Sequence, residues 1–154
     1  MFRIMLAVTL LVVWGLSSLA LAQGFTFAIG GPAASQDFKM KAAVFAFRTE
    51  GCADPANALV SGTAEGFVNG MRQSRPLQVV KASKPGVYGV FQNWSGEGVW
   101  VVNLKGTCGN QAAGAIVPLG PKGFIRESSK FLARPATNAE ISDSLKALLN
   151  GGTK

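Results

Sequence analysis

Few side chains in this sequence could do chemistry. Its 154 residues include no histidine. This absence excludes Ser-His-Asp and Cys-His nucleophile systems, and it excludes zinc or copper sites that depend on histidine ligands. Past residue 22 the methionines are Met40 and Met71, which are too few for a thioether copper site. We therefore expect no metal site and no cofactor.

The carboxylates are the next candidates for catalysis. Glu50 and Asp54 bracket Cys52 and could approach each other. A hydrolase built on paired acids needs its two carboxylates to face each other across a cleft. Two loop acids in solvent beside Arg48 are the simpler interpretation. We predict that the chain is not an enzyme and keep a carboxylate-based hydrolase as the alternative.

The sequence has two cysteines, Cys52 and Cys108. They are far apart and lack the C-x-x-C spacing of a redox pair. In an exported chain, two cysteines form a disulfide by default. We predict a structural bond between them, which closes a long loop and contributes about 4 kcal/mol by chain-entropy reasoning.

The first 22 residues predict export. Arg3 supplies a positive charge, residues 4–16 form an uncharged apolar run, and Ala20-Leu21-Ala22 matches the pattern that signal peptidase reads. A membrane anchor is the alternative, but glycine and serine interrupt the run before it reaches the roughly 20 residues that a spanning helix needs. We expect cleavage before Gln23. The mature chain is then a secreted or periplasmic single domain, residues 23–154, without a transmembrane segment.

Residues 92–98 are the first binding candidate. This stretch places Trp94 among Asn93, Ser95 and Glu97. A tryptophan on a loop is a typical hot-spot residue, and sandwich folds place recognition on the loops at their ends. In this hypothesis Trp94 supplies apolar contact and its neighbours supply a polar rim. The alternative is that Trp94 folds back and closes the end of the core.

Four basic residues on one predicted hairpin are the second binding candidate: Arg72, Arg75, Lys81 and Lys84. They could attach the protein to an acidic polymer or to an anionic membrane surface, and a solvated face is the simpler interpretation. The net charge is +7, but lysine and arginine are spread along the chain without a run of three. We expect an unknown envelope or extracellular partner and no nucleic acid.

Residues 85–105 should position the tryptophan loop, because they read as two strands around residues 92–98. Apolar side chains alternate in both strands, at Tyr88, Val90, Trp100, Val102 and Leu104. A period of two is typical of half-buried strands. We predict a hairpin that supplies the centre of the core.

Residues 58–83 contain a second hairpin signal. Asn69-Gly70 between two strand-like runs is the preferred type I′ connection. If Val68 faces Met71, then Ala64 faces Arg75 and Val60 faces Val79. The core face predicted from this register consists of Val60, Gly62, Ala64, Val68, Met71, Leu77 and Val79.

Three residues of this hairpin carry further expectations. Pro76 cannot donate to a ladder, so its strand should be bulged or at an edge. Gly62 and Gly66 leave room for a neighbouring side chain, either Trp100 or Tyr88. On the outer face, Arg72 should contact Phe67 or Glu65, which is worth at most about 1 kcal/mol.

Shorter segments complete the sheets, and the chain ends in a helix. Strands are expected at residues 23–29, 38–48, 111–119 and 124–126. Thr137 and Glu140 match a capping box. Apolar residues then follow at helical spacing, at Ile141, Leu145, Leu148 and Leu149. We predict a helix at about residues 138–149 that lays this stripe on the sheets.

These patterns predict an all-β, antiparallel, immunoglobulin-like sandwich of about seven strands with one C-terminal helix. Pro85-Gly86-Val87-Tyr88 and Gly96-Glu97-Gly98-Val99-Trp100 resemble the Gly-x-Tyr and Gly-x-Trp strands of small exported bacterial sandwiches, the FixH-like and transthyretin-like domains. The resemblance covers residues 39–105. It implies a sandwich architecture and a non-catalytic accessory or interaction role. Some members are associated with copper, but this chain lacks the histidine and methionine-rich segments for that role.

Overall fold

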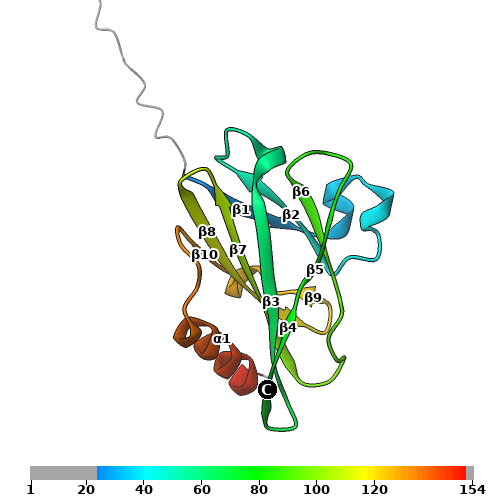
Figure 1. Cartoon of the computed structure of the whole chain (residues 1–154). Coiled ribbons are helices and arrows are strands. Elements are labelled where there is room, and N and C mark those ends of the chain that lie inside the picture. The colour runs from blue at the N-terminus through cyan, green and yellow to red at the C-terminus, as the bar shows by residue number, and fades with distance from the viewer. Residues whose placement is uncertain (1–23, 152–154) are drawn as a thin grey trace, which may run out of the picture.

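The computed structural model describes residues 24–151 and shows two antiparallel β-sheets packed face to face, with one α-helix at the C-terminal end (Figure 1). The strands are β1 (Thr26–Gly30), β2 (Phe45–Glu50), β3 (Leu59–Val68), β4 (Met71–Pro76), β5 (Gln78–Lys81), β6 (Val87–Phe91), β7 (Val99–Cys108), β8 (Gln111–Gly120), β9 (Gly123–Phe124) and β10 (Lys130–Leu132), and the helix is α1 (Asn138–Gly151). The predicted all-β sandwich with a C-terminal helix is confirmed. The predicted leader, residues 1–22, lies outside the described residues.

The first sheet has the strand order β1-β2-β6-β5, and the second has the order β10-β8-β7-β3-β4, with β9 paired to β8. Aromatic side chains of the first sheet fill the space between the sheets. Phe47 stacks on Tyr88 with 5.1 Å between ring centroids, and Phe27 meets Phe47 edge to face. The second sheet faces them with small and branched side chains, Val102, Leu104, Ala113, Ala115 and Val117. Rings on one side and smaller side chains on the other let the two layers interdigitate.

The predicted hairpin at residues 85–105 is wrong. Strand β6 lies between β2 and β5 in the first sheet, whereas β7 lies between β8 and β3 in the second. Residues 92–98 therefore cross from one sheet to the other, a distance of about 10 Å. Alternation fixes which side chains face inward but not which strand is the neighbour. The predicted burial is confirmed, because all five alternating apolar residues are buried.

The turn at Asn69-Gly70 is confirmed with its register. Both residues have positive φ, 50° and 76°, as a type I′ turn requires. Val68 faces Met71 and Ala64 faces Arg75. Met71 was expected in the core and is instead 65% exposed, because it lies at the tip of the hairpin.

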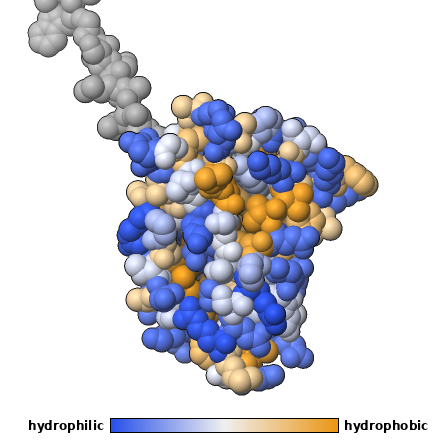
Figure 2. Space-filling model, viewed as in Figure 1, coloured by the Kyte–Doolittle hydropathy of each residue, from blue (hydrophilic) through white to orange (hydrophobic). Residues whose placement is uncertain are grey.

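The predicted pairing of Val60 with Val79 is wrong. Strand β4 ends at Pro76 as the outer strand of the second sheet, which confirms the expected edge. The Leu77 N–H still donates to Gly62 O at 3.0 Å, and the chain then enters the first sheet, where Val79 pairs with Val90. Figure 2 shows apolar side chains at the surface of the face on which Figure 1 shows β3 and β5.

The strand expected at residues 38–48 begins only at Phe45. Residues Phe38–Met40 form a 3-10 turn instead. The Asp37 side chain accepts a hydrogen bond from the Lys39 N–H at 2.9 Å and so caps this turn. A local cap of this kind competes with strand pairing.

Helix α1 begins as predicted. Glu140 N–H donates to Thr137 Oγ1 at 3.3 Å, and Glu140 Oε2 accepts from Thr137 N–H at 2.8 Å, which is a reciprocal capping box. Arg134 adds two hydrogen bonds to the same carboxylate, 2.8 and 2.9 Å long. The helix packs Ile141 and Leu145 on the outer face of the second sheet, against Val101 and Ile116.

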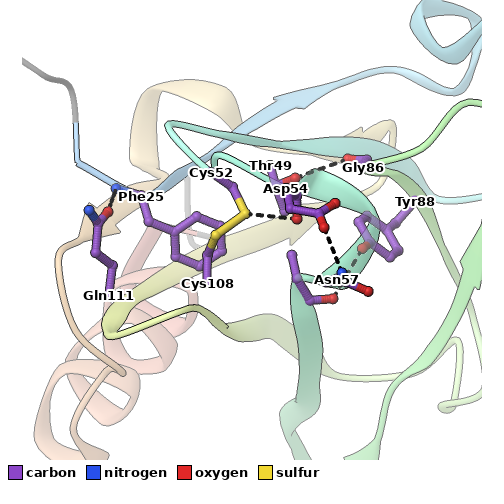
Figure 3. Close-up of a disulfide and its surroundings, with 10 residues drawn as sticks. Phe25, Thr49, Cys52, Asp54, Asn57, Gly86, Tyr88, Cys108 and Gln111 are labelled. Carbon is purple, nitrogen blue, oxygen red and sulfur yellow. Dashed lines mark hydrogen bonds between the residues drawn. A yellow bond between two sulfur atoms is a disulfide. The ribbon is translucent and has the colours of Figure 1, made fainter.

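The Cys52–Cys108 disulfide is present, with 5.8 Å between the Cα atoms (Figure 3). Cys52 follows β2 of the first sheet and Cys108 ends β7 of the second, so the bond joins the two sheets. Both cysteines pack against the core cluster that includes Phe25. Within residues 24–151, no helix has the length and apolarity needed to cross a membrane.

Candidate ligand-binding cleft

The side chain of Trp94, in the loop of residues 92–98, is partly buried. Its ring lies 6.2 Å from the ring of Trp100, tilted by 36°. Trp94 also packs against the edge of the core, near Leu119. The two hypotheses for Trp94, a recognition residue or a lid on the core, therefore each describe part of its surroundings.

Hydrogen bonds hold this loop in one conformation. Asn93 donates from Nδ2 to Pro76 O at 2.8 Å, which ties the loop to the edge of the second sheet. Gln92 donates to Trp94 O at 3.2 Å, and Glu97 N–H donates to Ser95 Oγ at 3.1 Å. The polar residues around Trp94 thus shape the loop, so the ring is presented without a large ordering cost on binding.

Two glycines, Gly66 and Gly98, allow close packing beside Trp100 and at the end of the loop. A Cβ atom at Gly66 would overlap the ring of Trp100, which confirms that Gly66 leaves room for that side chain. Gly98 has φ +79°, and a Cβ atom there would overlap Phe67 O. Trp100 lies on Gly66, its Nε1–H donates to Glu97 O at 2.8 Å, and Trp94 then packs on Trp100.

A cleft of about 1080 Å³ opens beside Trp94, at one end of the sandwich. Its first wall is the loop of residues 92–98. Its second wall comes from residues 118–130, which include Leu119 and Ile125, and its third is the C-terminal half of α1, with Ala147 and Leu148. Val99 and Trp100 also line the cleft. Most of these side chains are apolar, as in typical small-molecule sites.

Two polar groups in this cleft have no partner. Ser144 lies on α1, is 5% exposed, and its hydroxyl makes no hydrogen bond to any residue in the described range 24–151. The indole N–H of Trp94 also lacks an acceptor within this range, whereas that of Trp100 is satisfied. Neither polar atom is fully buried, so water can reach both in the free protein. The cleft therefore offers at least two hydrogen-bonding groups to a ligand.

Charged side chains line the same cleft. Glu127 and Lys130 come from the second wall, and Asp143 comes from α1. All three residues are exposed, so they belong to the rim. Both signs of charge are present, so the rim does not select a ligand by net charge alone.

The two acids considered for hydrolysis have other partners. Glu50 Oε1 pairs with Arg48 at 2.7 Å, and Asp54 Oδ2 accepts from Asn57 Nδ2 at 2.6 Å. Neither residue lines the cleft beside Trp94. These contacts agree with the simpler interpretation of solvated loop acids.

The structure does not gather the four basic residues onto one surface. Arg72 donates to Ser142 Oγ at 2.7 Å and pairs with Glu65 at 3.4 Å, which confirms the expected contact with Glu65. This bridge ties α1 to the edge strand β4. Arg75 is three positions along the same strand and so points to the opposite face. Lys81 belongs to β5 in the other sheet, and Lys84 lies in the loop that follows it.

The sequence predicted one wall of the cleft, the loop of residues 92–98, but not the other two. Leu148 was assigned to the stripe that packs on the sheet, and it serves both the stripe and the cleft. Ser144 could not be predicted as a site residue, because a serine within a helix is common and the sequence does not show that it is buried. Comparisons of the chain with family models, curated proteins and solved structures found no match, so a function for the cleft must be argued from its own geometry.

Proposed function

We propose that this protein is an exported, non-catalytic binding module of the bacterial envelope, and that its ligand site is the cleft beside Trp94. One observation carries the proposal: a half-buried tryptophan and a buried serine, whose side chains make no hydrogen bond within residues 24–151, line the same 1080 Å³ cleft. Known ligand pockets have volumes of roughly 300–1,000 Å³, so a cleft of this size accommodates a whole small molecule or a short peptide segment.

The lining suggests the chemistry of the ligand. Trp94, Leu119, Ile125 and Leu148 offer apolar contact, so the ligand needs an apolar body that gains by leaving water. The indole N–H of Trp94 can donate to an acceptor on the ligand, and Ser144 can donate or accept. A neutral or singly charged amphiphile with an oxygen acceptor at one end meets both requirements.

Export is supported by the Cys52–Cys108 bond. Disulfides persist in secreted and periplasmic proteins and are rare in the reducing cytosol. A hydrolytic role is less well supported, because Glu50 and Asp54 are engaged with Arg48 and Asn57 away from the cleft.

Displacement of an apolar dye tests the proposal. N-phenyl-1-naphthylamine should bind the wild-type protein and gain fluorescence, and long-chain alcohols should displace it. Trp94→Ala should weaken dye binding by about tenfold or more, as at a hot spot. Leu148→Ala changes the opposite wall and should weaken it as well.

Leu59→Ala is the matched control, because Leu59 is 73% exposed on β3 and does not line the cleft. This variant should bind the dye like the wild type. The proposal fails if Trp94→Ala and Leu148→Ala both keep wild-type dye affinity while their thermal unfolding shows that they are folded.

A further inference from the structure

A second surface stands apart from the cleft, at the 3-10 turn Phe38–Met40 on the outer face of the first sheet. Phe38 is 80% exposed, the largest exposed fraction among the big apolar side chains of residues 24–151. A phenylalanine this exposed gains nothing from the fold. Apolar groups that a protein presents in this way commonly mark a contact site.

The turn is rigidly held, so the exposure of Phe38 does not come from a loose loop. Met40 is fully buried, and its sulfur fills the space that a side chain at Gly89 of β6 would occupy. The Asp37 carboxylate accepts hydrogen bonds from Lys39 N–H at 2.9 Å and from Ser83 N–H at 2.7 Å. These hydrogen bonds lower the pKa of Asp37, so the carboxylate stays ionised and the turn stays tied to the loop after β5. Met40 anchors the turn, and Phe38 is left outside.

Three exposed lysines belong to the same corner as the exposed ring. A 3-10 turn has three residues per turn, so Phe38 and Lys41 lie on the same side. The ammonium of Lys41 is 5.0 Å from the centre of the Phe38 ring. Lys39 is exposed on the same turn, and Lys84 is exposed beside Ser83, in the loop that Asp37 binds. The nearest acid, Asp37, is engaged with backbone N–H groups.

We infer that this corner, formed by Phe38, Lys39, Lys41 and Lys84, contacts the surface of an anionic lipid bilayer. The lysines complement anionic headgroups, and each basic residue near such a surface is worth about a factor of five in affinity. Phe38 can enter the boundary between headgroups and acyl chains, where an aromatic ring leaves water. A soluble acidic polymer would match the lysines but would leave the ring in water, so the pairing of ring and cations favours a membrane. The inference is independent of the cleft, which shares no residue with this corner.

Sedimentation with lipid vesicles tests the inference, using the mature chain. The protein should bind vesicles of phosphatidylcholine with about 30% phosphatidylglycerol and should not bind pure phosphatidylcholine. Raising the salt concentration from about 0.05 to about 0.3 M should weaken binding, because salt screens exposed charges. Lys39→Ala/Lys41→Ala should lower the partition coefficient by about 30-fold, and Phe38→Ala should lower it by about tenfold.

Two controls match these variants in kind. Lys105→Ala/Lys146→Ala removes the same charge from the other sheet and from α1, and Met71→Ala removes a 65% exposed apolar side chain at the distant hairpin tip. Both should partition like the wild type. The changed side chains are exposed, so circular dichroism should show every variant folded.

Three results would overturn the inference. The first is a wild-type protein that ignores anionic vesicles. The second is a lysine control that weakens binding as much as Lys39→Ala/Lys41→Ala, since binding would then follow net charge alone. The third is a Phe38→Ala variant that keeps full vesicle affinity while the wild type binds soluble polyglutamate equally well, which would make an acidic polymer the partner.

Discussion

Removal of the Cys52–Cys108 bond should lower the free energy of unfolding by about 4 kcal/mol. The cysteines are 56 residues apart in the sequence. Closing a loop of this length removes about 14 cal/mol/K of entropy from the unfolded chain, which corresponds to about 4 kcal/mol near room temperature. The sulfur atoms are only partly buried, so lost packing should add little. Small domains have about 5–15 kcal/mol of stability in total, so the loss is large and still compatible with a folded protein.

Urea unfolding of a chain of residues 23–154 measures this loss. The oxidised wild type is compared with Cys52→Ser/Cys108→Ser, and the two tryptophans beside the cleft report the transition by fluorescence. The variant should unfold at lower urea. Its m-value should rise, because an unfolded chain without the cross-link exposes more surface. Treating the wild type with a reductant is the matched control, and it should reproduce the variant.

The reasoning fails if the variant loses less than about 1 kcal/mol and keeps the wild-type m-value. The cross-link would then change neither the entropy nor the exposed surface of the unfolded state. A loss of about 4 kcal/mol without a change in m would also contradict it, because the bond would then act on the folded state alone.

Three further outcomes follow from the packing. Gly66→Ala should cost more than about 2 kcal/mol in urea unfolding, because its Cβ would overlap the Trp100 ring, whereas Gly96→Ala, with no atom within 4 Å of the new Cβ, should cost almost nothing. Leu145→Ala should cost about 3 kcal/mol, because this side chain is 1% exposed between α1 and the second sheet. Hydrogen bonds from its arginine partner and from the capped backbone hold the pKa of Glu140 at about 2 instead of 4.5, so its contribution is present above pH 4.5 and is lost as the pH falls towards 2; the melting temperature of Glu140→Gln should depend less on pH in that window.

Local signals in the sequence were reliable because the interactions behind them are local. Asn69-Gly70 set the register of β3 against β4, since both residues adopt positive φ. Thr137 and Glu140 located the start of α1, because each satisfies a backbone N–H of the other. Alternation identified the inward faces of β6 and β7, since the pleat itself fixes that period.

Pairing between distant strands could not be predicted. The inward face of β6 is the same whether its neighbour is β7 or β2, so nothing in residues 85–105 identified the sheet to which each strand belongs. Val79 was misplaced for the same reason. Pro76 indicated the end of one edge strand. Nothing in the sequence predicted that the next strand, β5, would pair in the other sheet.

The cleft was foreseen only in part. Trp94 stood out because a tryptophan in a polar stretch is unusual. Ser144 and Leu119 became visible only once three segments met at one end of the sandwich. The corner at Phe38 was not predicted, for a different reason. Its alternating apolar residues predicted a strand, but the hydrogen bond from Lys39 N–H to Asp37 stabilises a 3-10 turn instead.

The route of the chain between the sheets has a consequence for how the protein folds. The chain crosses from one sheet to the other between β2 and β3, between β4 and β5, and between β6 and β7. Neither sheet is contiguous in sequence, so no fragment can complete one by itself. Strands β7 and β8 are internal strands of the second sheet, but they come last in sequence among the long strands. During synthesis, the β3–β4 hairpin therefore has an unpaired edge on β3 until β7 has been made. Such topologies fold in milliseconds to seconds rather than microseconds. Until β7 arrives, the open edge of β3 is the part of the chain most exposed to aggregation.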